Sequence, residues 1–123
     1  MKVKVSEAEG QVLDWMVAIC EGYTGLRKNP HRFDDDLIMT PPNKGYGPVY
    51  LHDMPHPSSW EFGGPIIERE GICLDYWNED DPWKADMSGD NEQFGDTPLI
   101  AAMRCYVTSK LGDEVEVPDE LLE

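Results

Sequence analysis

The sequence predicts an α+β fold: one compact domain over residues 1–123, an α/β sandwich of two main helices and a short bent helix packed on a small, mostly antiparallel sheet. Two segments, one near each end of the chain, repeat apolar residues at the helical period of about 3.6. Residues 72–76 instead alternate with the period that is typical of a strand. With 123 residues, of which 40% are hydrophobic, the chain has enough apolar surface for a single core.

The first helix is expected to begin after Ser6. Ser6 and Glu9 form a capping-box pattern, in which each side chain satisfies an amide of the first turn. Gly22 supplies the stop, because glycine readily adopts the left-handed conformation that ends a helix. Ahead of this helix, residues 3–5 predict a short strand or an extended arm. The apolar stripe of the helix consists of Val12, Leu13, Met16, Ile19 and Cys20.

Residues 24–56 are predicted to be a loop-rich, variable insertion. Six prolines and three glycines fall within residues 24–57, and these residues interrupt regular elements. We expect only two short extended pieces in this region, at residues 36–39 and 49–51.

Residues 58–70 contain two helix starts, which a single helix does not need. Ser58 begins a capping-box pattern, whereas Gly64 followed by Pro65 is typical of an N-cap glycine and a first helical proline. Pro65 has no amide hydrogen and its ring crowds the carbonyl four residues back. We therefore expect a first turn, a bend at Gly63 and Gly64, and a second helical segment up to about residue 70.

The strand at residues 72–76 is expected to form a hairpin with residues 83–87 across an acidic turn. Residues 113–123 form an acidic tail with six acids and no base. Val115 and Val117 predict an edge strand in this tail, and its last five residues are expected to fray.

The last helix is the most clearly bounded element. Thr97 is expected to be its N-cap, Pro98 its first residue and Gly112 its stop. Residues 98–112 include Arg104 and Lys110 but no acid. Its apolar stripe consists of Ile100, Met103, Val107 and Leu111.

Charge is the most uneven property of the chain. There are 25 acidic and 10 basic residues, giving a net charge of −15. This composition disfavours direct nucleic-acid binding, which needs a basic surface. It is compatible with an acidic inhibitor or nucleic-acid mimic, although many cytosolic proteins are acidic merely for solubility. No apolar run reaches the ~20 residues of a membrane span, so no membrane partner is expected.

Neither the cysteines nor the histidines predict a catalytic or metal site. Cys20, Cys73 and Cys105 are far apart in the sequence and are interpreted as reduced core residues. His52 and His56, with the aspartate between them, resemble a metal-ligand cluster only weakly, because the nearby prolines favour an extended path. We predict no catalytic residue, no metal and no cofactor.

A candidate ligand site combines the expected bend with the last helix. Amides of Gly63 and Gly64 would face an anion, helped by the dipole of a helix end. The Arg104 guanidinium would add a positive charge, and the ring of Trp60 or Trp83 would stack on a nucleotide-like ligand. These five residues are the predicted ligand-binding set.

Each of these residues also has a structural interpretation. The glycines would let the helix approach a neighbouring element closely. Arg104 would bind a carboxylate or a carbonyl, with Glu68 as one candidate partner. The tryptophans would pack in the core or brace the hairpin.

Three segments of the chain resemble the NinX family of lambdoid bacteriophages: "WEFGGPIIEREGI" (60–72), "WKA" (83–85) and "TPLIAAMRCYVTSKLGDEVEVPDEL" (97–121), together with the opening "MKVKVSE". Residues 24–56 contribute nothing to this resemblance. It implies a small phage accessory protein located in the host cytoplasm, similar to a wider group of α/β/α phage domains. It supplies no catalytic residues.

The resemblance implies a non-enzymatic binding role in phage–host interaction, because small accessory phage proteins commonly bind host or phage components. Some sequester nucleotide signals or block defence proteins. The partner is expected to be a small anionic ligand or, alternatively, a basic host protein. An exposed edge strand and the tryptophans would also suit a homodimer.

Overall fold

The computed structural model describes residues 1–28, 37–42, 47–51 and 59–122. Its helical elements are η1 (Val5–Glu7, a 3₁₀ turn), α1 (Gly10–Cys20), α2 (Trp60–Glu70), α3 (Pro98–Leu111) and α4 (Asp119–Leu122). Its strands are β1 (Lys2–Lys4), β2 (Thr24–Lys28), β3 (Leu37–Thr40), β4 (Val49–Tyr50), β5 (Cys73–Tyr76), β6 (Trp83–Met87), β7 (Asp90–Gly95) and β8 (Glu114–Glu116). This is the predicted compact α+β domain.

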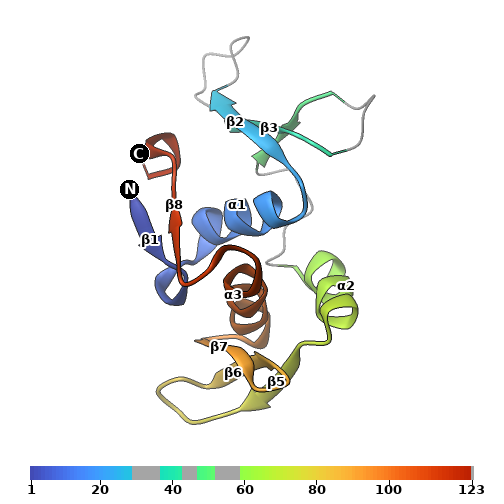
Figure 1. Ribbon diagram of the computed structural model, residues 1–123, viewed down its shortest axis with the longest axis vertical. Helices are drawn as coiled ribbons and strands as arrows, with labels where there is room; N and C mark the ends of the chain where they lie inside the picture. Colours follow the sequence, from blue (N-terminus) through green and yellow to red (C-terminus); the bar gives the residue numbers. More distant parts are fainter. Residues whose placement is uncertain (29–36, 43–46, 52–58, 123) are drawn as a thin grey trace.

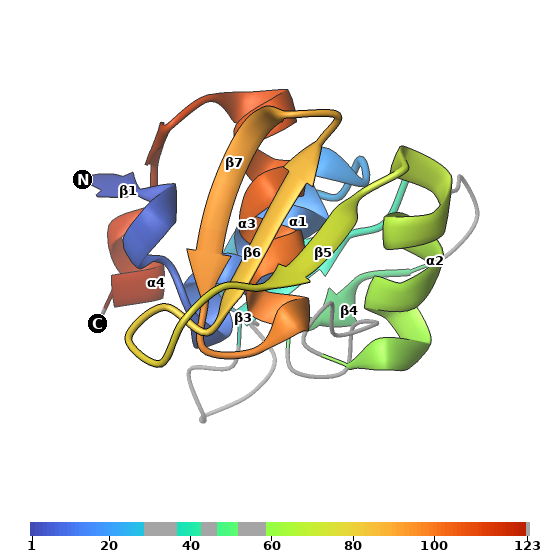
Figure 2. The same cartoon turned by 90° about the horizontal axis from the view of Figure 1, so that it is seen from below.

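Helix α3 lies at the centre of the domain. The sheet β5-β6-β7 packs on one side of α3 and α1 packs on the other. Helix α2 lies beside α3, in the same layer (Figure 1). Seen from below, the sheet lies in front of α3 (Figure 2). Because α3 is surrounded in this way, it contributes the largest share of the core; its buried residues are Leu99, Ala101, Ala102, Met103, Cys105, Tyr106 and Val107.

The boundaries of α3 are those that the sequence predicts. The Oγ1 atom of Thr97 accepts a hydrogen bond from the Ile100 amide at 3.1 Å, and Pro98 is the first helical residue. This cap satisfies one of the amides that a helix start leaves without a partner. Gly112 follows the last turn, with its amide donating to the Thr108 carbonyl at 3.0 Å.

The first helix begins later than the capping box at Ser6 indicates. Ser6 lies inside the short turn η1, and α1 starts only at Gly10. Gly10, the first residue of α1, has a φ of +57°, and this left-handed value prevents one continuous helix from running from Ser6 into α1. Val5 and Ala8, on either side of Ser6 and Glu7, are both buried in the core, where η1 contacts α3 and β7.

The predicted bend at Gly63 and Gly64 is wrong. Helix α2 runs without a break from Trp60 to Glu70 and has Pro65 inside it. Ser59, not Ser58, precedes its first residue, and the Gly63 amide donates to the Ser59 carbonyl at 2.8 Å. Gly64 explains how the helix continues: it lacks the Cβ atom with which the ring of a following proline would clash.

Three antiparallel sheets accompany the helices in the described residues: β1-β8, β2-β3-β4 and β5-β6-β7. The hairpin β5-β6 and the short strands β3 and β4 confirm the sequence prediction within one or two residues. Strands β2 and β7 were not predicted. The strand predicted in the acidic tail is β8, which pairs with β1, but the expected fraying is wrong: α4 forms there and buries Leu121.

Within the described ranges, every helix is too short or too polar to cross a lipid bilayer.

Candidate functional site

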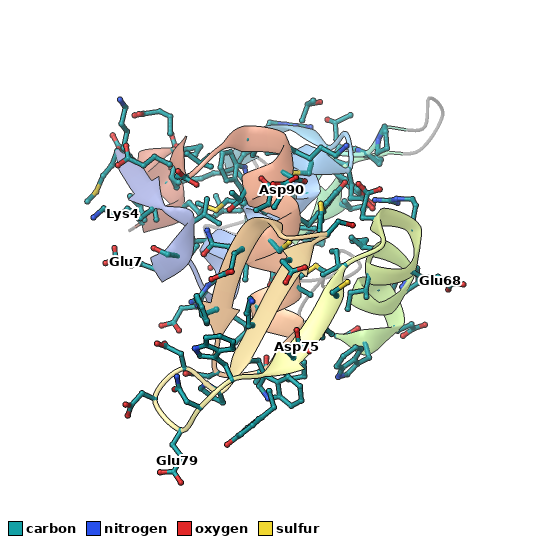
Figure 3. All side chains as sticks on the ribbon, turned by 60° about the horizontal axis from the view of Figure 1, so that its bottom comes forward. Lys4, Glu7, Glu68, Asp75, Glu79 and Asp90 are labelled. Atoms are coloured by element: carbon teal, nitrogen blue, oxygen red, sulfur yellow. The ribbon has the colours of Figure 1, made fainter. Side chains whose placement is uncertain are left out.

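Arg104 is a structural residue at the junction of η1, α3 and β7. Its Nε donates to the Ala8 carbonyl at 2.8 Å, and its NH1 group donates to the Phe94 carbonyl at 2.7 Å. The sequence left open whether Arg104 binds a carboxylate, a carbonyl or a ligand, and in the structure it binds two backbone carbonyls. The expected pair with Glu68 is not formed; Figure 3 shows Glu68 pointing outward from α2. Desolvation lowers the pKa of Arg104, partly opposed by the charges of Glu9 and Asp96.

The structure does not bring Arg104 together with the glycines of α2. Tyr106 faces α2, because the Arg69 side chain donates to its hydroxyl at 3.2 Å. Two residues along a helix correspond to a rotation of about 200°, so Arg104 leaves α3 on the side away from α2. Gly63 and Gly64 are internal residues of a continuous helix, and the Gly63 amide is already bonded.

The two tryptophans of the predicted ligand-binding set, Trp60 and Trp83, lie on different elements, α2 and β6. Trp60 is exposed at the first turn of α2. Trp83 lies in β6, where its ring meets the Tyr76 ring edge-on with centroids 5.6 Å apart. Trp83 therefore braces the hairpin, which is the structural alternative that the sequence left open for it.

A polar network that the sequence did not predict joins α1, α2 and α3. The Arg69 guanidinium donates two hydrogen bonds to the Glu21 carboxylate, at 2.9 and 3.2 Å, and the buried Tyr106 hydroxyl donates to the same carboxylate at 2.8 Å. Glu70 adds ion pairs with Arg69 and with Lys110. Burial, and then the Glu21 hydrogen bond, raise the pKa of Tyr106. All of its polar groups are paired with each other, so this network holds the helices together.

An apolar pocket of about 190 Å³ lies between the first turns of α1 and α3. None of the five residues predicted to bind a ligand lines it; the lining residues are Gly10, Leu13, Asp14, Thr97, Leu99, Ile100 and Met103.

The sheet β5-β6-β7 has one face against α3 and one face that no described element covers (Figure 2). Leu74, Ala85 and Gln93 stand opposite one another across the three strands. This row faces α3, because Ala85 is fully buried and the Gln93 side-chain amide donates to the Thr108 hydroxyl at 3.0 Å. Side chains alternate along a strand, so the neighbouring row is on the uncovered face.

The uncovered face carries a cluster of two aromatic rings and a lysine. The Lys84 Nζ atom lies 4.8 Å from the centroid of the Trp77 ring, a cation–π contact. The Trp77 ring meets the Phe94 ring at a centroid distance of 6.2 Å. Trp77 stays 55% exposed in this arrangement. We call Trp77, Lys84 and Phe94 the aromatic cluster.

Acidic side chains surround the aromatic cluster. Residues 75–96 include eight acids and a single base, Lys84. Lys84 is neutralised by Asp86 and Glu92, whose carboxylates lie 3.8 and 3.4 Å from its Nζ atom. Figure 3 shows Asp75, Glu79 and Asp90 along this side of the molecule. The face is therefore negative, with an apolar centre.

The cysteines differ more in burial than the sequence indicates. Cys105 is buried and Cys20 partly buried, as expected, but Cys73 is exposed because it lies on an edge strand. Burial is the main factor that raises the pKa of Cys20 to about 12 and that of Cys105 to about 11.

We expect one thiol, Cys73, to react with a maleimide at neutral pH within minutes, and the other two to react only when the protein unfolds. Thiolates are the reactive form, and Cys20 and Cys105 hold a negligible thiolate fraction at pH 7. Mass spectrometry of the labelled protein checks the order, and a Cys73→Ser variant should take up no label while it is folded. Rapid labelling of Cys105 would contradict the burial described here.

His52, Asp53 and His56 lie outside the described residues, so their metal prediction stays untested. Among the residues that are described, no cluster of histidine, cysteine or acidic side chains is arranged to hold a metal ion.

The fold and the site together define a class of protein: a small acidic α+β domain with an uncovered sheet face that carries aromatic side chains. A family model described as "Bacteriophage P22, NinX" matches residues 4–110. The chain belongs to this family and is a bacteriophage accessory protein. The match includes residues 24–56, which the resemblance noted from the sequence had left out, and it ends before the acidic tail. No curated protein matches the chain.

Proposed function

We propose that this phage accessory protein is a non-enzymatic binding protein of the host cytoplasm, and that it docks on a basic host protein through the uncovered face of β5-β6-β7. The single observation that carries the proposal is the aromatic cluster, an exposed tryptophan set among acids on a face that no described element covers. Tryptophans in such positions are typical anchors of protein interfaces.

The charge distribution supports a basic partner. Lys84 is already paired within the face, so the remaining carboxylates along residues 75–96 give a negative field. Such a field accelerates encounter with a positive surface and repels nucleic acid. An inhibitor that occupies the nucleic-acid-binding surface of a host defence protein would have these properties.

The anionic-ligand alternative has less support. It needs Gly63, Gly64 and Arg104 around one ligand, but they lie on different sides of α3, and the Arg104 guanidinium is occupied by two carbonyls. A net charge of −15 also opposes an anion.

The test compares two tryptophans of equal exposure. Trp77 is 55% exposed in the aromatic cluster, whereas Trp60 is 56% exposed at the start of α2. Tagged wild type, Trp77→Ala and Trp60→Ala would be purified from infected cells, and the co-purifying protein would be identified and made recombinantly. We expect Trp77→Ala to weaken its binding by about tenfold or more, as for an interface anchor, and Trp60→Ala to leave it unchanged.

Salt gives the second arm of this test. Binding between the purified proteins should weaken as salt rises, because exposed charges are screened. A partner that binds Trp77→Ala and wild type equally would contradict the proposal. So would native mass spectrometry that finds a small anion which also raises the melting temperature.

A further inference from the structure

Strand β5 is an edge strand of the sheet. Among the described strands it pairs only with β6, in the sheet order β5-β6-β7. Helix α2 precedes it in the chain but lies at the level of α3 rather than beside β5 in the plane of the sheet (Figure 1). In the part of the chain that is described, no strand occupies this edge.

The register between β5 and β6 determines which backbone amides and carbonyls of β5 point toward its open edge. The Trp77 amide donates to the Pro82 carbonyl at 2.7 Å, so these two residues form a hydrogen-bonded pair of the antiparallel ladder. Hydrogen-bonded and non-hydrogen-bonded pairs alternate. Tyr76 with Trp83 and Leu74 with Ala85 are therefore non-hydrogen-bonded pairs. The amides and carbonyls of Leu74 and Tyr76 consequently point away from β6, toward the open edge.

Asp75 lies between these two residues on the uncovered face of the sheet, where Figure 3 labels it. Its cross-strand neighbour is Lys84, but the Lys84 Nζ atom pairs with Asp86 and Glu92 instead. Among the described residues no ion pair involves Asp75. A strand added at the edge would place one residue directly opposite Asp75 in a non-hydrogen-bonded pair, in which side chains approach most closely.

Elsewhere in this chain a basic strand already pairs with an acidic strand. In the ribbon β1-β8, Lys2 stands opposite Glu116, Lys4 stands opposite Glu114, and a valine pair lies between them. A basic strand with alternating apolar residues thus fits an acidic strand of this molecule.

We infer that the free edge of β5 accepts an extended segment of the partner as a fourth strand, with a lysine or arginine opposite Asp75 and apolar residues beside Leu74 and Tyr76. Backbone pairing would supply up to four hydrogen bonds, and the charge would select basic segments. This inference rests on the proposed function, because it gives the way in which the basic partner binds. A second copy of the chain fits less well, since antiparallel self-pairing would bring acidic edges together.

The experiment uses a fluorescent peptide that alternates lysine with valine, and a control peptide that alternates glutamate with valine. The decisive variant is Tyr76→Pro, because proline removes the outward amide and is tolerated where the amide of an edge strand faces solvent. Its matched control is Tyr76→Ala, which loses the same ring contact with Trp83 but keeps the amide. Thermal unfolding would verify that both variants fold.

We expect the basic peptide to bind the wild-type protein and the acidic peptide not to bind. Tyr76→Pro should bind about tenfold more weakly than Tyr76→Ala, and Asp75→Asn should also weaken binding. Equal binding by Tyr76→Pro and Tyr76→Ala, or no binding of the basic peptide to wild type, would overturn the inference.

The experiments distinguish failure of the strand-addition inference from failure of the proposed docking on the sheet face. If the full partner depends on Trp77 but is insensitive to Tyr76→Pro, the sheet face binds it without strand addition and only the edge inference is lost. A wild-type dimer that Tyr76→Pro dissociates would assign the edge to a second copy and would also overturn the inference.

Discussion

Replacing Arg104 with methionine is expected to lower the free energy of unfolding by about 3 kcal/mol. The substitution keeps an apolar stem but removes two charge-assisted hydrogen bonds, and it leaves the carbonyls of Ala8 and Phe94 without their donor. One carbonyl belongs to the residue directly after η1 and the other to β7, so the loss loosens both segments from α3. Urea unfolding followed by circular dichroism measures the effect.

Two further variants make the Arg104 prediction specific. Arg104→Lys keeps the charge but cannot bond both carbonyls in the geometry of a guanidinium, so we expect a loss between those of wild type and Arg104→Met. Arg27→Met removes an arginine whose guanidinium is exposed, and it should cost less than about 1 kcal/mol. Equal stability of Arg104→Met and Arg27→Met would contradict the structural role of Arg104.

Gly95→Ala is expected to destabilise the protein by a similar amount, about 3 kcal/mol, because the end of β7 lies directly on the first turn of α3. A Cβ atom at Gly95 would lie 2.7 Å from the Ala101 backbone nitrogen and 2.8 Å from the Cγ2 atom of Ile100. Backbone cannot move aside as a flexible side chain can, so the helix and the sheet must separate.

Gly47→Ala is the control for Gly95→Ala, since no atom of the described residues lies within 4 Å of a Cβ atom at Gly47. Its effect on the melting temperature should be small. A Gly95→Ala protein that melts within a degree or two of Gly47→Ala would show that β7 and α3 are not in close contact.

The elements that could be predicted from sequence are those with local signals. Thr97 and Pro98 mark the start of α3 whatever surrounds it, and the alternation at 72–76 marks β5. The break at Gly10 and the continuation of α2 through Pro65 were not predictable in the same way. Gly64 permits a helical residue before Pro65, but the local sequence does not decide between a bend and a continuous helix, and it does not decide where the capping-box pattern at Ser6 ends.

The candidate site was predicted poorly for a related reason. Strand β7 is largely polar and has no strand pattern; its pairing depends on a turn in which Ser88 and Gly89 have positive φ values. Without β7, the contact between Trp77 and Phe94 cannot be anticipated. Arg104 was predicted to bind a ligand because it is a cation in a helix without acids. Its partners are the carbonyls of Ala8 and Phe94, which lie far from it in the sequence and which no local pattern identifies.

Hydrogen-exchange mass spectrometry of the protein alone and in complex with the partner recovered from infected cells tests the central claim most directly. If the uncovered face and edge of the sheet bind the partner, peptides that cover β5, β6 and β7 should gain protection, with the Leu74 and Tyr76 amides slowed most, while peptides of α2 stay unchanged. Protection confined to α2 around Gly63 and Gly64, with the sheet exchanging as it does in the free protein, would contradict the account.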